Sequence, residues 1–209
     1  MSEKKIHTIN PILVDVPMPI TTDRLIIRPT QAGDGKAISE AKRESWKELQ
    51  QWMEWAQGDV SKVSDEADEI LMREKAAEFL KRDELMLLAF DKASGKLVAS
   101  TGLHRIKWNI RRFEIGYWVR SSETGKGIAS EITNALTRYA FGALAANSVY
   151  IGHAEGNYAS QRVIEKLGFV KEGHTKMDST AGPRITNSLH YARYNTDGLP
   201  DLDISYGSK

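Results

Sequence analysis

The segment Glu114-Ile-Gly-Tyr-Trp-Val-Arg-Ser-Ser-Glu-Thr-Gly-Lys-Gly-Ile-Ala129 joins a strand pattern to a helix pattern. Apolar side chains alternate with other residue types over 113–119, which predicts a strand. Apolar residues then recur at helical spacing from Ile128 to Ala143. Gly125 and Gly127 stand in the polar connection, where glycine lets backbone N–H groups approach a ligand closely. Together with the free N–H groups at a helix start, this loop predicts an anion site suited to a pyrophosphate.

The patterns on either side of this segment predict a mixed sheet. Three strand patterns joined by short turns predict an antiparallel meander, and the strand-helix-strand run that follows predicts a parallel βαβ crossover. We expect strands at 24–28, 85–90, 96–105, 113–119, 147–154, 169–172 and 184–194, and helices at 32–55, 64–82, 127–143 and 158–167. Gly102 is a possible bulge. The helix at 64–82 is expected to bury a stripe of Ala67, Ile70, Leu71, Ala77 and Leu80.

Length and composition predict one ordinary globular domain. The chain has 209 residues, of which 41% are hydrophobic and 27% charged, with a formal net charge of +1. We expect an N-terminal arm at 1–22, the domain at 23–195 and an irregular tail at 196–209. The small net charge gives no support to a nucleic-acid binder, and no apolar run reaches the length of a membrane span. The absence of cysteine excludes disulfides and thiolate metal sites.

Three known phosphate-binding loops were compared with this segment. A Walker A loop needs Ser or Thr after Gly-Lys, but Gly127 follows Lys126, so that motif fails. A Rossmann fingerprint is a closer rival, because Gly125 and Gly127 match its first two glycines and Glu155 ends the next strand. Ser130 occupies its third small position, however, and the unit follows a meander instead of opening a doubly wound sheet.

The third loop fits best, because several segments resemble the GNAT acyltransferases. Thr124-Gly-Lys-Gly-Ile-Ala129 resembles motif A of that family, Arg/Gln-x-x-Gly-x-Gly/Ala. Asn157-Tyr-Ala-Ser-Gln-Arg-Val-Ile-Glu-Lys-Leu-Gly-Phe169 resembles the family's Asn-x-x-Ser to Leu-Gly-Phe segment. Arg111–Trp118 and Thr22–Pro29 resemble strands of the ribosomal-protein N-terminal acetyltransferase branch, the RimJ/RimL type. The resemblance covers residues 21–195.

This resemblance implies an α/β (α+β) fold of the GNAT type: a mixed, mostly antiparallel central sheet with splayed parallel strands, flanked by helices. It also implies acetyl-CoA as co-substrate, with its pantetheine arm between the strands at 113–119 and 148–154. Thr124 stands where the family usually has Arg or Gln, which removes one potential phosphate contact. The residues that the resemblance assigns to the cofactor are Trp118, Val119, Thr124, Gly125, Lys126, Gly127, Ile128, Ala129, Asn157 and Arg162.

Acetyl transfer to an amine needs a base, an oxyanion donor and a group that stabilises the leaving sulfur. Glu114 is the candidate base, because the strand period places it on the face opposite Phe113, Ile115 and Tyr117. The competing interpretation is a structural ion pair with Arg105, Arg111 or Arg112.

Ser160 is the candidate for the leaving group, since it lies in the first turn of the helix at 158–167. A serine there can instead satisfy local backbone groups, so a capping role competes. Asn157 is expected both to cap this helix and to bind pantetheine. Tyr158 is a second candidate acid, and Lys166 a second candidate phosphate ligand.

Three tryptophans lie in the helical insertion with which the family walls its acceptor groove. Trp52 and Trp55 nearly share a helical face, whereas Trp46 and Trp52 do not. These residues are expected either to pack as core or lid, or to form a stacking platform for a flat or peptide acceptor.

The resemblance implies an N-acetyltransferase that moves acetyl from acetyl-CoA to a primary amine by direct attack in a ternary complex. The acceptor is a protein N-terminal α-amine or a small-molecule amine. A detoxifying acetyltransferase of an antibiotic or aminoacyl-nucleotide analogue and a non-catalytic acyl-CoA-binding regulator remain alternatives. We expect no metal, no nucleic-acid or membrane partner, a monomer or homodimer, and a cytoplasmic location.

Overall fold

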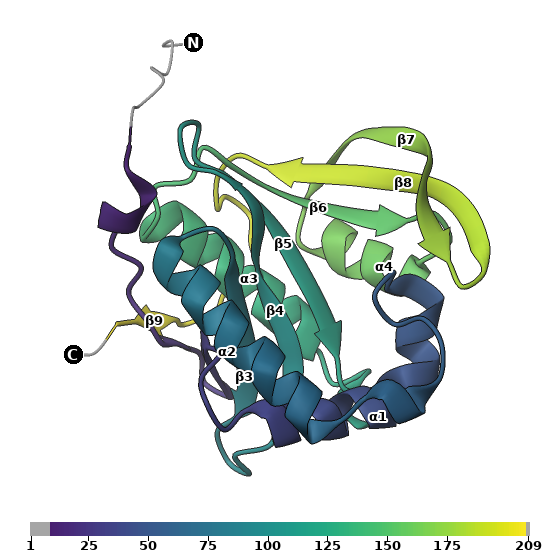
Figure 1. Cartoon of the computed structure of the whole chain (residues 1–209). Helices are drawn as coiled ribbons and strands as arrows, with labels where there is room; N and C mark the ends of the chain where they lie inside the picture. Colours follow the sequence, from purple (N-terminus) through teal and green to yellow (C-terminus); the bar gives the residue numbers. More distant parts are fainter. Residues whose placement is uncertain (1–8, 208–209) are drawn as a thin grey trace.

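The protein is built around one mixed sheet (Figure 1). The computed structural model describes residues 9–207, so residues 1–8 of the expected arm lie outside the described part. The strand order is β7-β8-β6-β5-β4-β3-β2-β1-β9. The strands are β1 (Ile20–Thr21), β2 (Leu25–Pro29), β3 (Leu85–Asp91), β4 (Leu97–Lys107), β5 (Arg112–Val119), β6 (Ser148–Ala154), β7 (Val170–Ala181), β8 (Arg184–Arg193) and β9 (Ser205–Tyr206).

Four helices cover the two faces of this sheet, with α1 (Gly35–Trp52) and α2 (Asp65–Lys81) on one side. The helices α3 (Ile128–Gly142) and α4 (Tyr158–Lys166) lie on the other side (Figure 1). The alternation in β5 sorts its side chains between these layers, because neighbouring residues of a strand point to opposite faces. Phe113 and Ile115 pack with α3 and α4 in the main core, whereas Trp118 packs with residues of α1 and α2.

The helix α3 follows its sequence pattern closely. Its apolar positions Ile132, Leu136 and Tyr139 are fully buried against β5 and β6. Truncating a buried leucine such as Leu136 to alanine costs about 2–5 kcal/mol. The start of the helix is held in place by Glu131 in its first turn, which accepts hydrogen bonds from Thr22 and Arg24, between β1 and β2. The anion loop is therefore attached to a rigid element.

The parallel pair β5 and β6 stays together for only three residue pairs. The pairing runs from Arg112 opposite Ser148 to Glu114 opposite Tyr150, and both strands continue beyond it without pairing to one another. The strands diverge from this point (Figure 1). Because β5 still pairs with β4 and β6 with β8 along this stretch, the two edges that face the gap keep unpaired backbone groups.

Two sequence predictions about the helices are corrected by the structure. The first helix ends at Trp52, not at 55, because Met53 is extended and takes the C-cap position. In α2 the predicted stripe is wrong: Ile70 and Leu80 are 54% and 68% exposed, while Met72 and Phe79 are buried. The helix is rich in charged residues, so its few apolar positions fit more than one helical face.

Three further differences concern strands. Gly102 is not a bulge: it pairs directly with Gly116, and the register of β4 against β5 shifts instead between His104 and Lys107. The strand after α4 extends to Ala181, far beyond 172, as a long outer strand paired with β8. The tail, expected to be irregular, contributes the short strand β9, which pairs with β1.

Candidate active site

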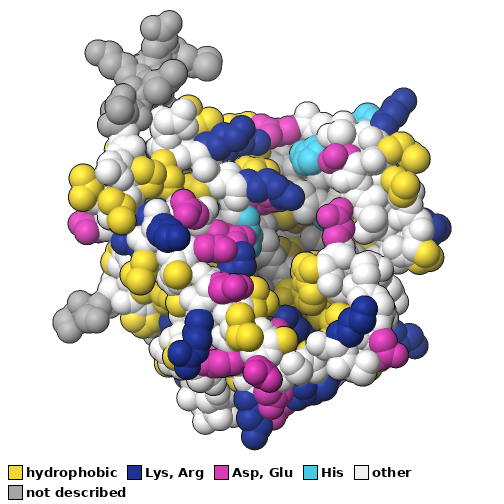
Figure 2. Space-filling model, viewed as in Figure 1, with side chains coloured by type: hydrophobic (Ala, Val, Ile, Leu, Met, Phe, Trp, Pro, Cys, Tyr) yellow, Lys and Arg dark blue, Asp and Glu magenta, His cyan; other side chains and the backbone are white. Residues whose placement is uncertain are grey.

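The gap between β5 and β6 is the centre of the candidate site. The space-filling view shows a hollow in the face where these strands diverge, with histidine and acidic side chains at its rim (Figure 2). Arg120 donates its N–H to Val98 on β4 (2.9 Å), so the N–H of Val119 points to the opposite edge, toward β6. The predicted pantetheine contact at Val119 thus has a free donor on the correct edge.

Tyr117 and Ser160 meet across this gap on the α3 and α4 side. Their hydroxyl oxygens lie 3.0 Å apart, one on β5 and the other in the first turn of α4. Burial raises the pKa of Tyr117 to about 12, although the hydrogen bond with Ser160 lowers it somewhat. Tyr117 therefore stays a neutral hydroxyl at physiological pH. The pair offers O–H groups, not charges, to whatever atom occupies this end of the gap.

Asn157, not Ser160, caps α4. The Asn157 side chain accepts a hydrogen bond from the Ser160 N–H (3.1 Å), which is the standard capping contact. The capping role of Asn157 is confirmed, and the Ser160 hydroxyl is bonded to Tyr117. Tyr158, the other acid considered, is 67% exposed.

The loop that leads into α3 is open at the helix start. Gly125 and Gly127 have φ values of 76° and 81°, which side chains other than glycine rarely adopt. Gly127 is the N-cap residue and no side chain caps this helix, so the first N–H groups, including those of Ile128 and Ala129, have no intrahelical acceptor. Free N–H groups and the positive end of the helix dipole make an anion site.

Some side chains in and near this loop form hydrogen bonds or ion pairs with other described residues of the protein, and one does not. Thr124 donates its hydroxyl hydrogen bond to the Ser121 carbonyl (2.8 Å) within its own turn. Lys126 is ion-paired with Glu123 (2.8 Å). Arg162 is exposed on α4, and its side chain makes no hydrogen bond or ion pair within residues 9–207. The backbone of the loop is thus better placed than the Thr124 or Lys126 side chain to bind an anion.

Glu114 lies on the other face of the sheet, toward α1 and α2. The residue is only 8% exposed. Its carboxylate forms an ion pair with Arg105, one of the three partners considered from the sequence. The other oxygen faces β6, since a Cβ added to Gly152 would lie 3.5 Å from Glu114 Oε1. Burial and the neighbouring Glu114 charge raise the pKa of Tyr150 to about 12, so Glu114 stands beside a neutral tyrosine.

On this face of the sheet, two glycines leave room for a histidine ring. Gly102 and Gly116 are directly paired across β4 and β5, and the imidazole of His104 lies over both. A Cβ on Gly116 would come within 2.8 Å of the His104 ring, so only glycine leaves room for it. His104 Nδ1 lies 2.5 Å from Glu84 Oε1. Hydrogen bonds from His104 and Lys75 hold the pKa of Glu84 well below its usual range, against the effect of burial.

The three tryptophans form contacts that their spacing in the sequence did not predict. Trp55 follows the end of α1 and packs against Trp46 and against Trp118, with ring centroids 6.3 Å apart in both pairs. Trp52 instead points to the loop before α4, where its ring edge lies 4.0 Å from a Cβ added to Gly156. The shared helical face predicted for Trp52 and Trp55 is not formed, because the helix ends at Trp52 and does not continue to 55. The Trp118 side chain faces this cluster and not α4.

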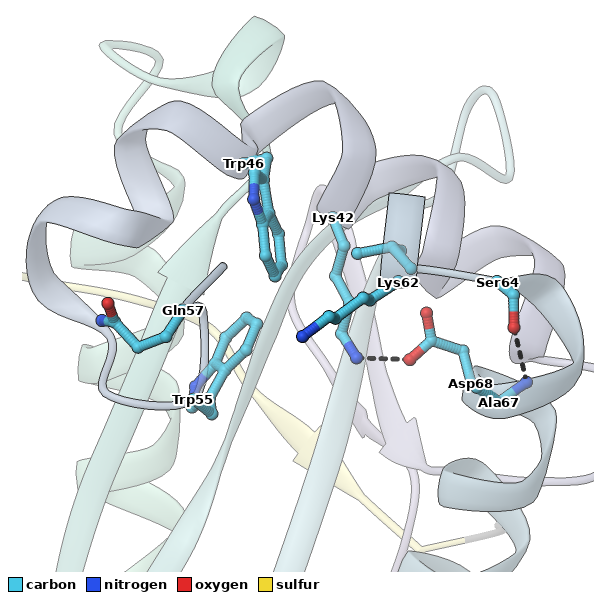
Figure 3. A pocket seen from close by; sticks show the side chains of 9 residues that line it. Lys42, Trp46, Trp55, Gln57, Lys62, Ser64, Ala67 and Asp68 are labelled. Carbon is cyan, nitrogen blue, oxygen red and sulfur yellow. Dashed lines mark hydrogen bonds and ion pairs between the residues drawn. The ribbon is translucent and has the colours of Figure 1, made fainter. Parts of the chain in front are cut away.

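A cavity of about 210 Å³ lies beside the tryptophan cluster, between α1, α2 and the connecting loop (Figure 3). Trp46 and Trp55 form one wall, and an ion pair between Lys42 and Asp68 forms another. The cavity is separate from the gap between β5 and β6, but Trp55 connects the two through Trp118.

Two residues of this site were not assigned from the sequence. Tyr117 was counted only as part of the apolar face of its strand, and His104 was given no role. The available signals were faint: a tyrosine two residues before the end of β5, and a histidine on a strand that also carries Gly102. The partners Ser160 and Glu84 are 43 and 20 residues away in the chain.

The family comparison agrees with this geometry. The family model described as the acetyltransferase (GNAT) domain matches residues 24–170. The chain belongs to the GNAT acetyltransferase family. The match includes the loop before α3 and the Asn157–Phe169 segment, on which the resemblance was based, and the mixed sheet with its diverging parallel pair is the fold that the family implied.

Individual relatives match parts of this GNAT domain. The "Putative ribosomal N-acetyltransferase YdaF" of Bacillus subtilis (strain 168) is 39% identical over 82 residues, 39% of this chain and 45% of that protein. The chain spans about half the length of the curated relatives it matches.

Solved structures extend the similarity in fold. The ribosomal L7/L12 α-N-protein acetyltransferase RimL in complex with coenzyme A has a TM-score of 0.76 at 21% identity, covering 84% of this chain and 96% of that one. Mycobacterium smegmatis RimJ in complex with CoA-disulfide has a TM-score of 0.75 at 23% identity, covering 88% and 90%. Among the described helices, none is both long and apolar enough to cross a bilayer.

Proposed function

We propose that this GNAT protein transfers acetyl from acetyl-CoA to a primary amine, by direct attack while both substrates are bound. The observation that carries the proposal is the gap between β5 and β6, which has different chemistry on its two faces. Neutral hydroxyls of Tyr117 and Ser160 lie on the α3 and α4 face. The buried carboxylate of Glu114 lies on the α1 and α2 face. An acyl donor and an amine entering from opposite faces would meet in the gap.

The α3 side fits acetyl-CoA. The uncapped start of α3 and the glycine loop offer N–H groups to the pyrophosphate, and Arg162 is free to approach phosphate oxygens. The free N–H of Val119 would bind the pantetheine or the thioester oxygen, and Asn157 follows the end of β6, where its backbone N–H donates to the Ala154 carbonyl. When the amine attacks, the thioester C–S bond breaks and sulfur leaves as a thiolate. The Ser160 or Tyr117 hydroxyl would donate a hydrogen bond to it.

The α1 side fits a protonated amine that must become neutral. The Glu114 carboxylate would hold the ammonium group and take its proton, directly or through a water. Its ion pair with Arg105 does not prevent this, because Arg105 is 75% exposed and only one carboxylate oxygen pairs with it. Trp46 and Trp55 then form a wall of the acceptor groove, while Trp52 lies at the side of the α4 loop.

A protein N-terminal α-amine is the acceptor that we favour. The curated relative is named a ribosomal N-acetyltransferase, and the similar solved structure is an α-N-protein acetyltransferase. The hollow over the β5 and β6 gap is open to the surface, so a chain terminus has room to enter (Figure 2). A ribosomal acceptor would place the protein in the cytoplasm.

Two measurements on one preparation test this proposal. Calorimetry should show micromolar binding of acetyl-CoA and none of NAD or ATP. Mass spectrometry should then show one added acetyl group on members of a panel of N-terminal peptides and small amines. Binding of NAD without CoA would overturn the assignment of the loop. Tight binding of acetyl-CoA with no acetylation across the panel would favour a non-catalytic acyl-CoA-binding protein.

A further inference from the structure

We propose that His104, oriented by Glu84, is a second proton acceptor of the acetyl transfer, beside Glu114. This inference rests on the proposed function, and it adds a catalytic residue that the sequence did not single out. His104 and Glu114 are Cα partners across β4 and β5, so their side chains share one face of the sheet.

The contacts of His104 leave one nitrogen available. Nδ1 is bonded to Glu84, whose other carboxylate oxygen bonds Lys75 on α2. Lys75 and His104 together favour the charged carboxylate, and a carboxylate at Nδ1 favours the tautomer with hydrogen on Nδ1 and a lone pair on Nε2. No group within residues 9–207 forms a hydrogen bond with Nε2. The His104 side chain is 27% exposed, so solvent reaches part of it.

The position of the ring points to the gap. Nε2 would lie 2.9 Å from a Cβ on Gly116, so it stands directly over the backbone of β5 just past the last pair with β6. Glu114 turns the other way, toward Arg105 and Gly152. Glu114 therefore lies on the β6 side of β5, and His104 on the β4 side, on the same face of the sheet. Gly102 and Gly116 leave the room that the ring occupies, so the ring lies close against the backbone of β4 and β5.

The proton then has a complete route. The amine nitrogen bonds to the acetyl carbon, the C–S bond breaks, and the amine proton moves to Nε2 directly or through Glu114 or a water. The thiolate takes a proton from solvent, and His104 returns its proton to solvent before the next turnover. An imidazole suits this step, because one ring nitrogen can accept a proton while the other stays bonded to Glu84.

Other charged groups around His104 will shape the pH response. The groups that face this region are Glu84 just before β3, Lys75 and Glu78 from α2, Arg105 on β4 itself and Glu114 from β5, with Tyr150 on β6 beyond Glu114. Any pH limb must therefore be assigned by comparing variants, not from its midpoint.

The test uses His104→Asn, whose amide can still donate to Glu84, and His104→Gln as a second variant. His174→Asn, an exposed histidine on β7, is the matched control. Turnover of an acetylated peptide from the panel is followed from pH 5.5 to 9 together with the melting temperature and the Kd of acetyl-CoA. We expect about 10²-fold slower transfer at pH 7 in both His104 variants, loss of the acidic limb, unchanged CoA binding and a normal control.

Two further variants sharpen the result. Glu84→Gln should slow transfer by about tenfold and displace the limb without removing it, because it only weakens the orientation of the ring. The double variant Glu114→Gln/His104→Asn should lose little more than the worse single variant if both residues serve one proton route. A folded His104→Asn with wild-type rate and pH profile overturns the role of His104 alone. Failure of the wild-type protein to acetylate any amine while it binds acetyl-CoA overturns the proposed function and this role with it.

Discussion

The two faces of the β5 and β6 gap are built in different ways. On the α3 and α4 face, Tyr117 and the loop glycines come from one short segment and Ser160 from a second, 43 residues from Tyr117, and each segment has a strong local pattern. On the α1 and α2 face, Glu114 meets His104, Glu84 and the Trp55 cluster, which come from different strands and an irregular loop. A local motif can therefore specify the donor side, whereas only the folded sheet assembles the acceptor side.

The faces also differ in chemistry. The proposed donor side carries backbone N–H groups and hydroxyls that stay neutral, as the raised pKa of Tyr117 indicates. The acceptor side relies on ionisable groups, with Glu114 paired to Arg105 and Glu84 paired to Lys75 and His104. Substitutions on the donor side should change CoA binding or a pH-independent rate. Substitutions on the acceptor side should change the pH dependence.

The largest effect is expected at Glu114. Glu114→Gln keeps the shape and removes the proton acceptor, so turnover should fall about 10²-fold at pH 7 and recover partly at high pH, where more amine is already neutral. Steady-state rates across pH measure this. Glu172→Gln is the matched control, since Glu172 is also ion-paired with an arginine (3.1 Å) but lies on β7. If the ion pair were the whole role of Glu114, Arg105→Gln would lower the rate and stability as much as Glu114→Gln does.

The hydroxyl pair should have the next largest effect. A hydrogen bond to a developing thiolate is worth about 1.5–3 kcal/mol, so Ser160→Ala should lower turnover by roughly 10- to 100-fold with CoA affinity nearly unchanged. Tyr117→Phe removes the other hydroxyl and separates the two donors. Because the pKa of Tyr117 is about 12, neither loss should vary with pH between 6 and 9.

Stability must be measured on the same samples, because Ser160→Ala leaves a buried tyrosine hydroxyl without its partner. That loss costs about 1–3 kcal/mol. A destabilised Ser160→Ala with full activity would show that the pair is structural and that another group stabilises sulfur.

A substitution in the glycine loop before α3 should change the affinity for CoA. Gly127→Ala adds a Cβ at φ 81° beside the helix start and should weaken CoA binding tenfold or more, about 1.4 kcal/mol. The backbone strain is controlled by Gly95→Ala, at φ 68° in the turn between β3 and β4 with nothing near its side-chain position. Calorimetry on both variants separates strain from loss of the site, and equal CoA affinity in both would remove the loop from the site.

The smallest effect is expected at the tryptophans. Trp55→Ala removes a ring that contacts Trp46 and Trp118 on the acceptor wall. Aromatic contacts of this kind are worth about 0.5–1.5 kcal/mol, so the KM of a peptide acceptor should rise by roughly two- to twelvefold with the Kd of CoA unchanged. An equal rise for CoA would show that the ring stabilises the gap itself.

The order and type of the elements were predictable because their patterns are local. The period-2 run in β5, the buried stripe of α3 and the Asn157 cap needed only neighbouring residues. The stripe of α2 was not predictable, since its apolar residues are few and charged ones surround them; tertiary packing selected Met72 and Phe79. The length of β7 was also missed, because its exposed, polar sequence becomes a strand only through pairing with β8.

The candidate site likewise had features that were predictable from local sequence and features that depended on the fold. Glycines before α3 and Ser160 were visible in the sequence, whereas the bond from Ser160 to Tyr117 required the fold. The tryptophan arrangement was mispredicted because α1 stops at Trp52, which places Trp55 in a loop. His104 could not be predicted from the sequence, because its proposed role depends on Glu84, just before β3, and on the space that Gly102 on β4 and Gly116 on β5 leave for its ring.

A crystal structure of the protein with CoA tests the central claim most directly. We predict that the pyrophosphate lies at the start of α3 against the N–H groups after Gly127. The pantetheine should lie between β5 and β6 with a hydrogen bond to Val119, and the sulfur should be within hydrogen-bond reach of the Ser160 or Tyr117 hydroxyl. Glu114 and His104 should face that sulfur from the other side. CoA bound in the cavity beside Trp46 and Trp55, or with its sulfur turned away from the gap, would contradict the division of the site into a donor face and an acceptor face.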